Sequence, residues 1–313
     1  MEITILIPTY NRGEIIALAI DSILANKFKG RFEIVVIDDG SDGQNIEWLR
    51  KIEKMDKRVK IFYRKHLGPA GARNFGIAKA KGEIIIFLND DTIVKNDFLR
   101  RHWQFHQTRS GMGKTVIGEM VEDPVMIKNT AMVWLTEASQ MHFKYKAIDG
   151  KRNLVLMPWY YFWTCNVSVK REFLFNNKLK FDEAFTVPAW EDVDFGYRAK
   201  LAGMKLYLDK KLKTIHHHEL NYEDIKKRFF THGRGLFYIQ KKLPTGLLPP
   251  LAKKHYRVLA KIFFYVACPP IILDLINKWL VRSKKLNNYL MQLVIIREKL
   301  KGYDYEANAA AKM

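Results

Sequence analysis

Residues 33–41 read EIVVIDDGS, a short run of apolar and β-branched residues that ends in two aspartates, a glycine and a serine. Such a run is too short for a helix and is bounded by turn-forming residues, so it predicts a strand buried in a sheet. The first hundred residues contain four runs of this kind: Ile3–Ile7, Glu33–Ile37, Val59–Tyr63 and Glu83–Leu88. Helical patterns lie between them, at Gly13–Leu24, Asn45–Met55 and Pro69–Lys79.

This alternation of strands and helices predicts an α/β fold with a parallel sheet. Parallel neighbours need crossover connections, which are right-handed and carry helices onto the faces of the sheet. Ligands of such sheets bind at the carboxyl ends of the strands. We therefore look for function in the polar residues that directly follow each predicted strand.

The rest of the chain divides into an irregular middle and a helical end. Residues 110–190 show little periodicity and many aromatic residues, most densely at Pro158–Trp163. A helical pattern at Trp190–Gly203, which Gly203 would terminate, precedes predicted strands at Lys205–Leu208 and Leu212–His216. The pattern beyond them is helical, so we expect one domain over residues 1–220 and a helical extension over residues 221–313.

The composition indicates a folded, basic protein without a disulfide framework. The 313 residues include 53 Lys or Arg and 33 Asp or Glu, for a net charge of +20, and the 48% of hydrophobic residues suffices for a packed core. Two cysteines, Cys165 and Cys268, exclude a disulfide framework and a four-cysteine zinc site. The first residues lack the features of a secretory signal, so we expect a cytoplasmic protein.

The positive charge is concentrated near the end of the chain. Residues 240–313 hold 14 Lys or Arg against 4 Asp or Glu, which suits nucleic acid, an anionic membrane or an anionic substrate. Val258–Val281 is strongly apolar but is interrupted by polar residues and by Pro269-Pro270. This pattern favours an interfacial or re-entrant helix pair over a span, and hence peripheral attachment to the cytoplasmic face of an anionic membrane. The alternative is that these helices pack on the catalytic domain.

Three polar loops follow predicted strands: Pro8-Thr9-Tyr10-Asn11, Asp38-Asp39-Gly40-Ser41 and Asn89-Asp90-Asp91. In a parallel sheet they lie at one edge, where converging carboxylates repel each other unless a cation or hydrogen-bond donors balance them. One such loop could simply cap the next helix. Two facing acidic loops in a basic chain favour a metal or nucleotide site.

Two common phosphate-binding motifs are excluded. No G-x-G-x-x-G sequence follows the first strand, which argues against a dinucleotide-binding Rossmann site. Gly113-Lys114-Thr115 matches the end of a P-loop, but Thr108 stands where that loop requires glycine.

Five ordered motifs over residues 1–218 resemble the inverting glycosyltransferases of family 2. That family has the GT-A fold, a Rossmann-like, mostly parallel sheet flanked by helices, here with a C-terminal helical extension. The resemblance implies a metal-dependent enzyme that moves a sugar from a nucleotide-sugar to an acceptor hydroxyl. The motifs are Ile7–Asn11, Val36–Ser41, Gly68–Gly76, Phe87–Asp91 and Trp190–Phe195.

The resemblance also implies roles for the donor-side residues. Asp39 would accept a base N–H of uracil, and Thr9 and Tyr10 would wall the base pocket. Asp91 would hold a divalent cation, Mn²⁺ or Mg²⁺, as the last member of the D-x-D signature, whose first position here is Asn89. The full set of implied nucleotide-binding residues is Pro8, Thr9, Tyr10, Asn11, Asp39, Arg73, Asn89 and Asp90.

On the acceptor side the resemblance implies Asp192 as general base, with Glu191 beside it. A carboxylate in the first turn of a helix is kept ionised by the helix dipole, although both residues also suit that turn for structural reasons. A histidine of His216-His217-His218 would complete the metal shell. Alternation along a strand favours His216 or His218 over His217. Trp163, Asn166 and Trp190 are acceptor-side candidates.

The leading hypothesis is therefore an inverting glycosyltransferase that uses a UDP-sugar and a glycan or lipid-linked acceptor. A nucleotidyltransferase that makes sugar nucleotides is the nearest alternative. Such enzymes usually carry a glycine- and basic-rich loop after the first strand, and Pro8–Arg12 is not a loop of this kind. A third possibility is a basic membrane- or nucleic-acid-binding protein with a vestigial site. We expect no nucleic-acid partner.

Overall fold

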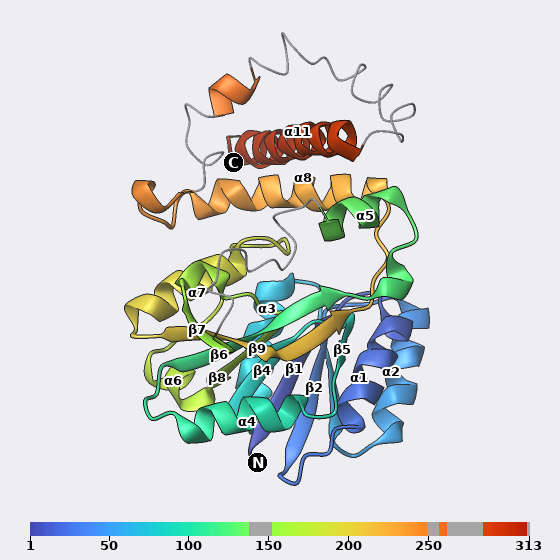
Figure 1. Cartoon of the computed structure of the whole chain (residues 1–313), viewed down its shortest axis with the longest axis vertical. Helices are drawn as coiled ribbons and strands as arrows, with labels where there is room; N and C mark the ends of the chain where they lie inside the picture. The colour runs from blue at the N-terminus through green and yellow to red at the C-terminus, as the bar shows by residue number, and fades with distance from the viewer. Residues whose placement is uncertain (138–151, 249–256, 262–283, 312–313) are drawn as a thin grey trace. The chain divides into compact units, whose positions relative to one another are not determined.

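The computed structural model describes residues 1–137, 152–248, 257–261 and 284–311 (Figure 1). The chain forms two compact units. The first unit takes its described residues from Met1–Pro124, Phe143–Thr186 and Glu191–His218, and the second from Val125–His142, Val187–Trp190 and Glu219–Met313. The division of the chain at residue 220 stays a prediction.

The first unit is built on one mixed sheet, with the strand order β3-β2-β1-β4-β8-β6-β9-β5 and β7 paired to β9. The strands β1 to β4 pair in parallel with one another, whereas β8 joins both β4 and β6 antiparallel. The strands are β1 (Ile3–Thr9), β2 (Phe32–Asp38), β3 (Val59–Tyr63), β4 (Ile84–Leu88), β5 (Thr92–Val94), β6 (Lys114–Glu122), β7 (Leu154–Met157), β8 (Asn166–Lys170) and β9 (Lys205–His216).

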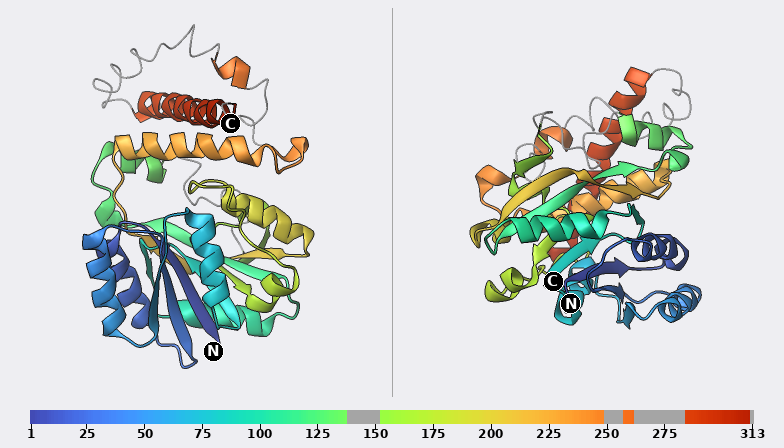
Figure 2. Two further views of the ribbon diagram at one scale, coloured as in Figure 1. Left: turned by 180° about the vertical axis from the view of Figure 1, so that it is seen from behind. Right: turned by 60° about the horizontal axis from the view of Figure 1, so that its bottom comes forward.

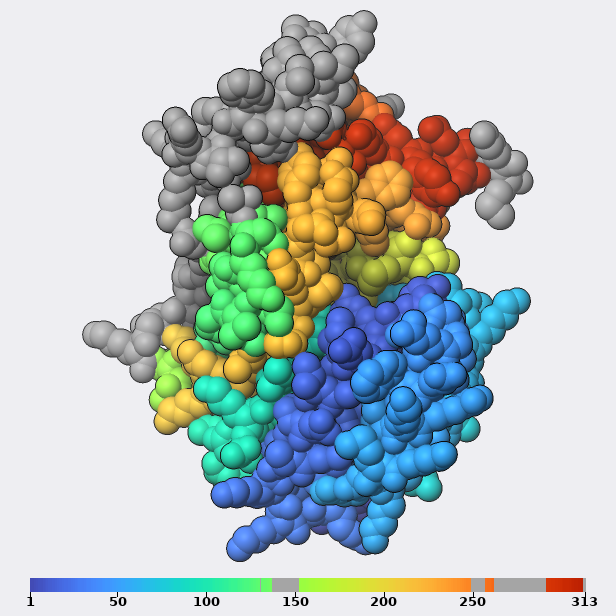
Figure 3. All heavy atoms as spheres, turned by 90° about the vertical axis from the view of Figure 1, so that its right-hand side faces the viewer, coloured from blue at the N-terminus to red at the C-terminus, as the bar shows by residue number. Residues whose placement is uncertain are grey.

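Helices cover both faces of this sheet, as crossover connections require. One face carries α1 (Gly13–Leu24), α2 (Gly43–Met55) and α4 (Phe98–Thr108), and the other carries α3 (Pro69–Lys79), α6 (Arg171–Asn176) and α7 (Glu191–Leu201). Figure 2 shows α3 in front of the central strands in its left view, and Figure 3 shows the outer surface of α1 and α2 in blue.

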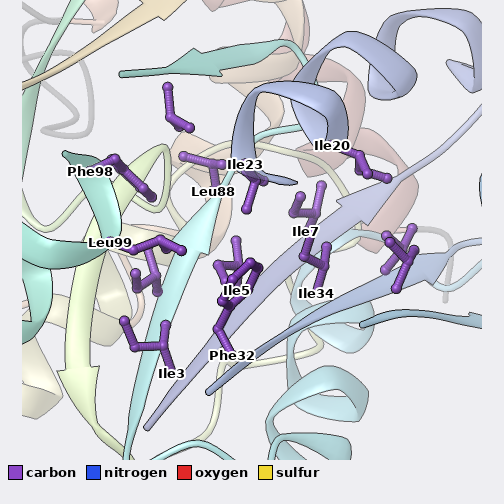
Figure 4. Close-up of a cluster of buried hydrophobic side chains, with 14 of the residues drawn as sticks. Ile3, Ile5, Ile7, Ile20, Ile23, Phe32, Ile34, Leu88, Phe98 and Leu99 are labelled. Carbon is purple, nitrogen blue, oxygen red and sulfur yellow. The ribbon is translucent and has the colours of Figure 1, made fainter. Parts of the chain in front are cut away.

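Alternation along the strands divides the core between the two faces. Ile3, Ile5 and Ile7 of β1 point toward α1 and α4 in one apolar cluster (Figure 4), whereas Leu6 packs with α3 in the other. The central strands are buried on both faces, which explains why their sequences read as continuous apolar runs.

The predicted α/β fold and the four N-terminal strands and three helices are confirmed, with bounds that differ by at most two residues. The description of residues 110–190 as irregular is wrong, because β6, β7 and β8 lie there. These strands pair with distant partners rather than with sequence neighbours, so no local strand–helix alternation marks them.

The two strands predicted between residues 205 and 216 form one strand, β9. Its pairing with β6 shifts register between Gly118 and Glu119, and this irregularity explains the break in the apolar pattern. The helix before it is shorter than predicted and ends at Leu201. Gly203 adopts φ +94°, and the N–H of Met204 donates to the carbonyl of Ala199 at 2.9 Å, as expected for a glycine-terminated helix.

The second unit includes the helices α5 (Thr130–Glu137), α8 (Tyr222–Ile239) and α11 (Lys284–Ala310). They share an apolar cluster that includes Trp134, Phe229 and Ile295. The helices α8 and α11 approach closely, since a Cβ at Gly302 would lie 1.9 Å from the carbonyl oxygen of Phe230.

Within the described part of the chain, no helix has the length and apolarity needed to cross a bilayer. Most of the apolar segment Val258–Val281, on which the expectation of membrane attachment rests, lies outside the described residues.

Candidate active site

The loop after β1 joins the loops after β2 and β4 through its polar side chains. Thr9 is buried, and its hydroxyl donates to Asp90 Oδ2 at 2.8 Å. Asn11 has φ 53°, and its backbone N–H donates to the hydroxyl of Ser41 at 2.8 Å. Tyr10 is exposed and stacks on His66, with ring centroids 4.4 Å apart. The predicted convergence of the three loops is therefore observed.

Asp39 lies in a cradle of donors directly after β2. Its carboxylate accepts the backbone N–H groups of Leu67 at 3.2 Å and Gly68 at 2.9 Å, and Arg64 Nε lies 3.6 Å away. Gly68 has φ +90°, a conformation that side-chain-bearing residues avoid, so glycine lets this loop turn its N–H toward Asp39. The cradle fixes the orientation of the Asp39 carboxylate.

The loop after β4 brings two buried carboxylates against one arginine. Arg12 Nη1 donates to Asp91 Oδ2 at 2.6 Å and to Asp90 Oδ1 at 3.2 Å. Asn89, at the first position of this acidic motif, is partly exposed. Arg12 thus supplies positive charge that two adjacent buried carboxylates need.

Two histidines from the end of β9 complete a cluster around Asp91. His216 Nε2 and His218 Nδ1 lie 3.3 Å and 3.5 Å from Asp91 Oδ2. Asp91, His216 and His218 each offer one potential metal-ligand atom, and these atoms lie within 4.8 Å of one another. His217 points elsewhere and pairs with Asp123 at 2.7 Å. The preference for His216 and His218 over His217 agrees with this geometry.

The Asp91–His216–His218 cluster has the chemistry of a divalent-metal site. Carboxylate oxygen with imidazole nitrogen is a donor set suited to Mn²⁺. Asp91 Oδ1 is buried and has no hydrogen-bond partner among the described residues, which leaves it available to a ligand. His216 Nδ1 lies 2.8 Å from Glu122 Oε2, so a carboxylate orients the ring as it does for many ligating histidines. The residues therefore fit a bound cation.

The charges of this cluster are strongly interdependent. Burial raises the pKa of Asp90 to about 6, although Arg12 counteracts it. Burial also disfavours the charge on Asp91, but His216, His218 and Arg12 outweigh it and hold the pKa of Asp91 well below its usual range. Burial opposes charge on His216 as well, and Asp91 and Glu122 nevertheless raise its pKa to about 9.

A second acidic pair opens α7. Glu191 is buried, and its Oε1 accepts a hydrogen bond of 2.8 Å from Nη1 of Arg73, which comes from α3. Asp192 is partly exposed and accepts the N–H of Val193 at 2.8 Å. The expectation that the start of the helix keeps this carboxylate ionised is not met, because burial and the charge of Glu191 raise the pKa of Asp192 to about 7. Asp192 is thus a carboxylate suited to exchanging a proton near neutral pH.

The three acceptor-side candidates lie in different environments. Trp163 is partly buried beside Tyr161, with ring centroids 5.3 Å apart. Asn166 is fully buried in the sheet, where its side chain bonds to His102 and to the carbonyl of Leu212. Trp190 belongs to the second unit, and its Nε1 donates to the carbonyl of His232 at 3.0 Å. Asn166 therefore lies in the interior of the unit and not on an open surface.

The structure adds two residues that the sequence analysis missed. Arg12 directly follows the first polar loop, so the need of Asp90 and Asp91 for a counter-charge was a signal that could have found it. Glu122 pairs with His216 through the register of β6 and β9, and no local pattern predicts that contact.

Comparison with known proteins agrees with this geometry. The profile described as Glycosyl transferase family 2 matches residues 4–168, more than half of the chain. An uncharacterized glycosyltransferase of Rickettsia conorii is 40% identical in a 119-residue alignment that covers 34% of this chain and 19% of that protein. The chain therefore spans about a fifth of that relative's length.

Two solved structures share the fold over nearly the whole chain. A mannosyltransferase from Pyrobaculum calidifontis in complex with GDP-Man and Mn²⁺ has a TM-score of 0.61 at 14% identity, covering 97% of this chain and 87% of that chain. S. aureus TarS 1–349 in complex with UDP-GlcNAc has a TM-score of 0.56 at 14% identity, covering 99% and 92%. With its GT-A-like sheet and the matched residues 4–168, the chain belongs to glycosyltransferase family 2.

Proposed function

We propose that the protein is an inverting, metal-dependent glycosyltransferase that takes its sugar from a nucleotide-sugar. The observation that carries this proposal is the Asp91–His216–His218 cluster at the carboxyl edge of the sheet, where Asp91 Oδ1 has no hydrogen-bond partner in the described part of the chain. Asp91, His216 and His218 would hold Mn²⁺ or Mg²⁺. The cation would supply Lewis-acid stabilisation of the charge that develops on the departing nucleotide.

The donor is proposed to be a UDP-sugar. Asp39, whose carboxylate is fixed by the N–H groups of Leu67 and Gly68, is proposed to accept a uracil N–H. Thr9 and the exposed Tyr10 flank the same loop and would wall the base. Pro8, Asn11, Asn89 and Asp90 are proposed to take part in nucleotide binding as well. The similarity to TarS, which was solved in complex with UDP-GlcNAc, supports a UDP-sugar.

Asp192 is proposed to take the proton of the acceptor hydroxyl as that oxygen attacks the sugar. An inverting transfer needs such a base opposite the leaving group. The raised pKa of Asp192, about 7, is close to the operating pH that favours efficient proton transfer. Arg73 is proposed to lie beside the diphosphate of the donor, and Glu191 is proposed to orient Arg73 through their ion pair. A glycan or lipid-linked acceptor is proposed, with Trp163, which belongs to the same unit as Asp192, as a candidate contact.

Nucleotide release tests this function. The protein is incubated with UDP-, GDP- and dTDP-sugars, with Mn²⁺ or with a chelator, and the freed nucleotide is measured. We expect release from a UDP-sugar that depends on Mn²⁺. The proposal fails if no donor is turned over under any of these conditions while UDP and Mn²⁺ also fail to bind.

Attachment to an anionic membrane is proposed as the way the enzyme meets a membrane-borne acceptor. The support is the surplus of basic residues over 240–313. Full-length protein should float with anionic vesicles at low salt and dissociate at high salt, whereas a chain ending near Gln240 should not float. Full-length protein that stays unbound at low salt contradicts attachment.

A further inference from the structure

The guanidinium of Arg12 lies among the groups proposed to hold the cation. Its Nη1 is 2.6 Å from Asp91 Oδ2 and 3.2 Å from Asp90 Oδ1. Its Nη2 is 3.4 Å from His218 Nδ1. Arg12 therefore contacts two of the three members of the Asp91–His216–His218 cluster.

The backbone around Arg12 is held firmly, whereas its side chain is not enclosed. The N–H of Gly13 donates to the side chain of Asn45 at 2.8 Å, and a Cβ at Gly13 would lie 2.6 Å from that of Trp48. The Arg12 side chain is 31% exposed, in contrast to 6% for Asp91. The guanidinium can thus change position without any movement of the chain that carries it.

A guanidinium and a divalent cation draw on the same carboxylate and repel each other at this range. We propose that Arg12 is a built-in competitor of the metal ion, whose guanidinium must leave Asp91 before the cation binds there. The diphosphate of an arriving nucleotide is an anion of the kind that arginine binds well, so it gives the displaced guanidinium a new partner. Arg12 would in this way make tight metal binding depend on the nucleotide. This inference rests on the metal site of the proposed function.

Direct binding of Mn²⁺ tests the competition without any measurement of activity. Free Mn²⁺ is titrated by electron paramagnetic resonance against wild-type protein and Arg12→Gln, with and without UDP. We expect Arg12→Gln to bind Mn²⁺ alone about tenfold more tightly or better, because a repelling charge is removed. We also expect UDP to improve Mn²⁺ binding less in Arg12→Gln than in the wild type.

Arg58→Gln is the matched control, since Arg58 forms an ion pair of 2.7 Å with Asp56 outside the cluster. It removes the same charge from the same unit and should leave Mn²⁺ affinity unchanged. Thermal unfolding verifies that each variant is folded. Should Arg12→Gln fail to fold, Arg12→Met replaces it, because methionine also lacks the positive charge while it keeps an unbranched side chain. Arg12→Met should likewise bind Mn²⁺ more tightly than the wild type.

The outcomes separate this inference from the proposed function. If the wild type binds Mn²⁺, Asp91→Asn does not, and the Arg12 variant binds with unchanged or weaker affinity, competition is overturned while the metal site stands. If neither the wild type nor the Arg12 variant binds Mn²⁺, with or without UDP, the metal site is overturned and competition with it.

Discussion

The two acidic pairs, Asp90–Asp91 after β4 and Glu191–Asp192 at the start of α7, look alike in sequence but differ in their charge environment. Arg12, His216 and His218 surround Asp91 and keep it ionised, so the pKa of Asp91 lies well below its usual range. Arg73 pairs with Glu191, whereas burial and Glu191 raise the pKa of Asp192 to about 7. A carboxylate that stays charged suits a cation, and one that titrates near neutrality suits proton transfer.

The comparison teaches that neighbouring positive groups, rather than the acidic motif itself, decide which chemistry a carboxylate pair can support. Each pair contains one carboxylate whose pKa is raised, Asp90 to about 6 and Asp192 to about 7. Among the described residues only the first pair adjoins two histidines, and this difference assigns the metal to Asp91 in our proposal.

Removal of the Asp91 carboxylate should have the largest effect. Asp91→Ala should abolish Mn²⁺-dependent UDP binding and sugar transfer, because the one carboxylate of the cluster is lost. Calorimetry of UDP binding with and without Mn²⁺ measures this, and Asp56→Ala, which removes a partly exposed carboxylate outside the cluster, is the control. Unchanged metal-dependent UDP affinity in Asp91→Ala would contradict the assignment.

Asp192→Asn should separate the two pairs. This nearly isosteric change should lower transfer by about 10²–10⁴-fold, the range typical of a lost general base, while UDP affinity stays within a few-fold. Transfer kinetics measure the rate of sugar transfer, and calorimetry measures the affinity for UDP. Transfer above about a tenth of the wild-type rate would mean that Asp192 serves only to start α7.

The two neighbouring histidines offer a matched pair of variants. His218→Asn should weaken Mn²⁺ affinity by at least about tenfold, because His218 adjoins Asp91. His217→Asn should change it much less, since the His217 ring pairs with Asp123. Titration of free Mn²⁺ compares them. Equal losses in both variants would argue that the metal lies elsewhere.

The pH profile should show the smallest of these effects. A base with a raised pKa is active above that pKa, so kcat/KM should fall as the pH drops through about 7, the pKa of Asp192. Glu191→Gln removes the negative charge that helps raise the pKa of Asp192, and the glutamine still offers an oxygen to Arg73. The fall of kcat/KM on the acid side should therefore move to lower pH. A fall that stays in place, with the variant folded, would show that another group controls the profile.

Most of the donor-side half of the site could be predicted from sequence because its residues lie at the ends of strands. Thr9 ends β1, Asp39 directly follows β2 and Asp91 lies in the loop after β4, and parallel pairing brings those ends to one edge. Strands that are buried on both faces have a continuous apolar run in the sequence, and this run predicts where they lie. The strands of residues 110–190 gave no such signal, since their partners are distant in the chain.

The sequence by itself determined the order of strands and helices over the first hundred residues, the polar loops and the family motifs, because burial and turn chemistry are local. Only the tertiary structure decided which charged side chains are in contact with one another. Arg73 and Glu191 are 118 residues apart, and Arg12 and His218 are 206 apart, yet each pair is in contact. Such contacts follow from sheet register and helix packing, which depend on the whole folded chain, and they set the charge of each carboxylate in the site.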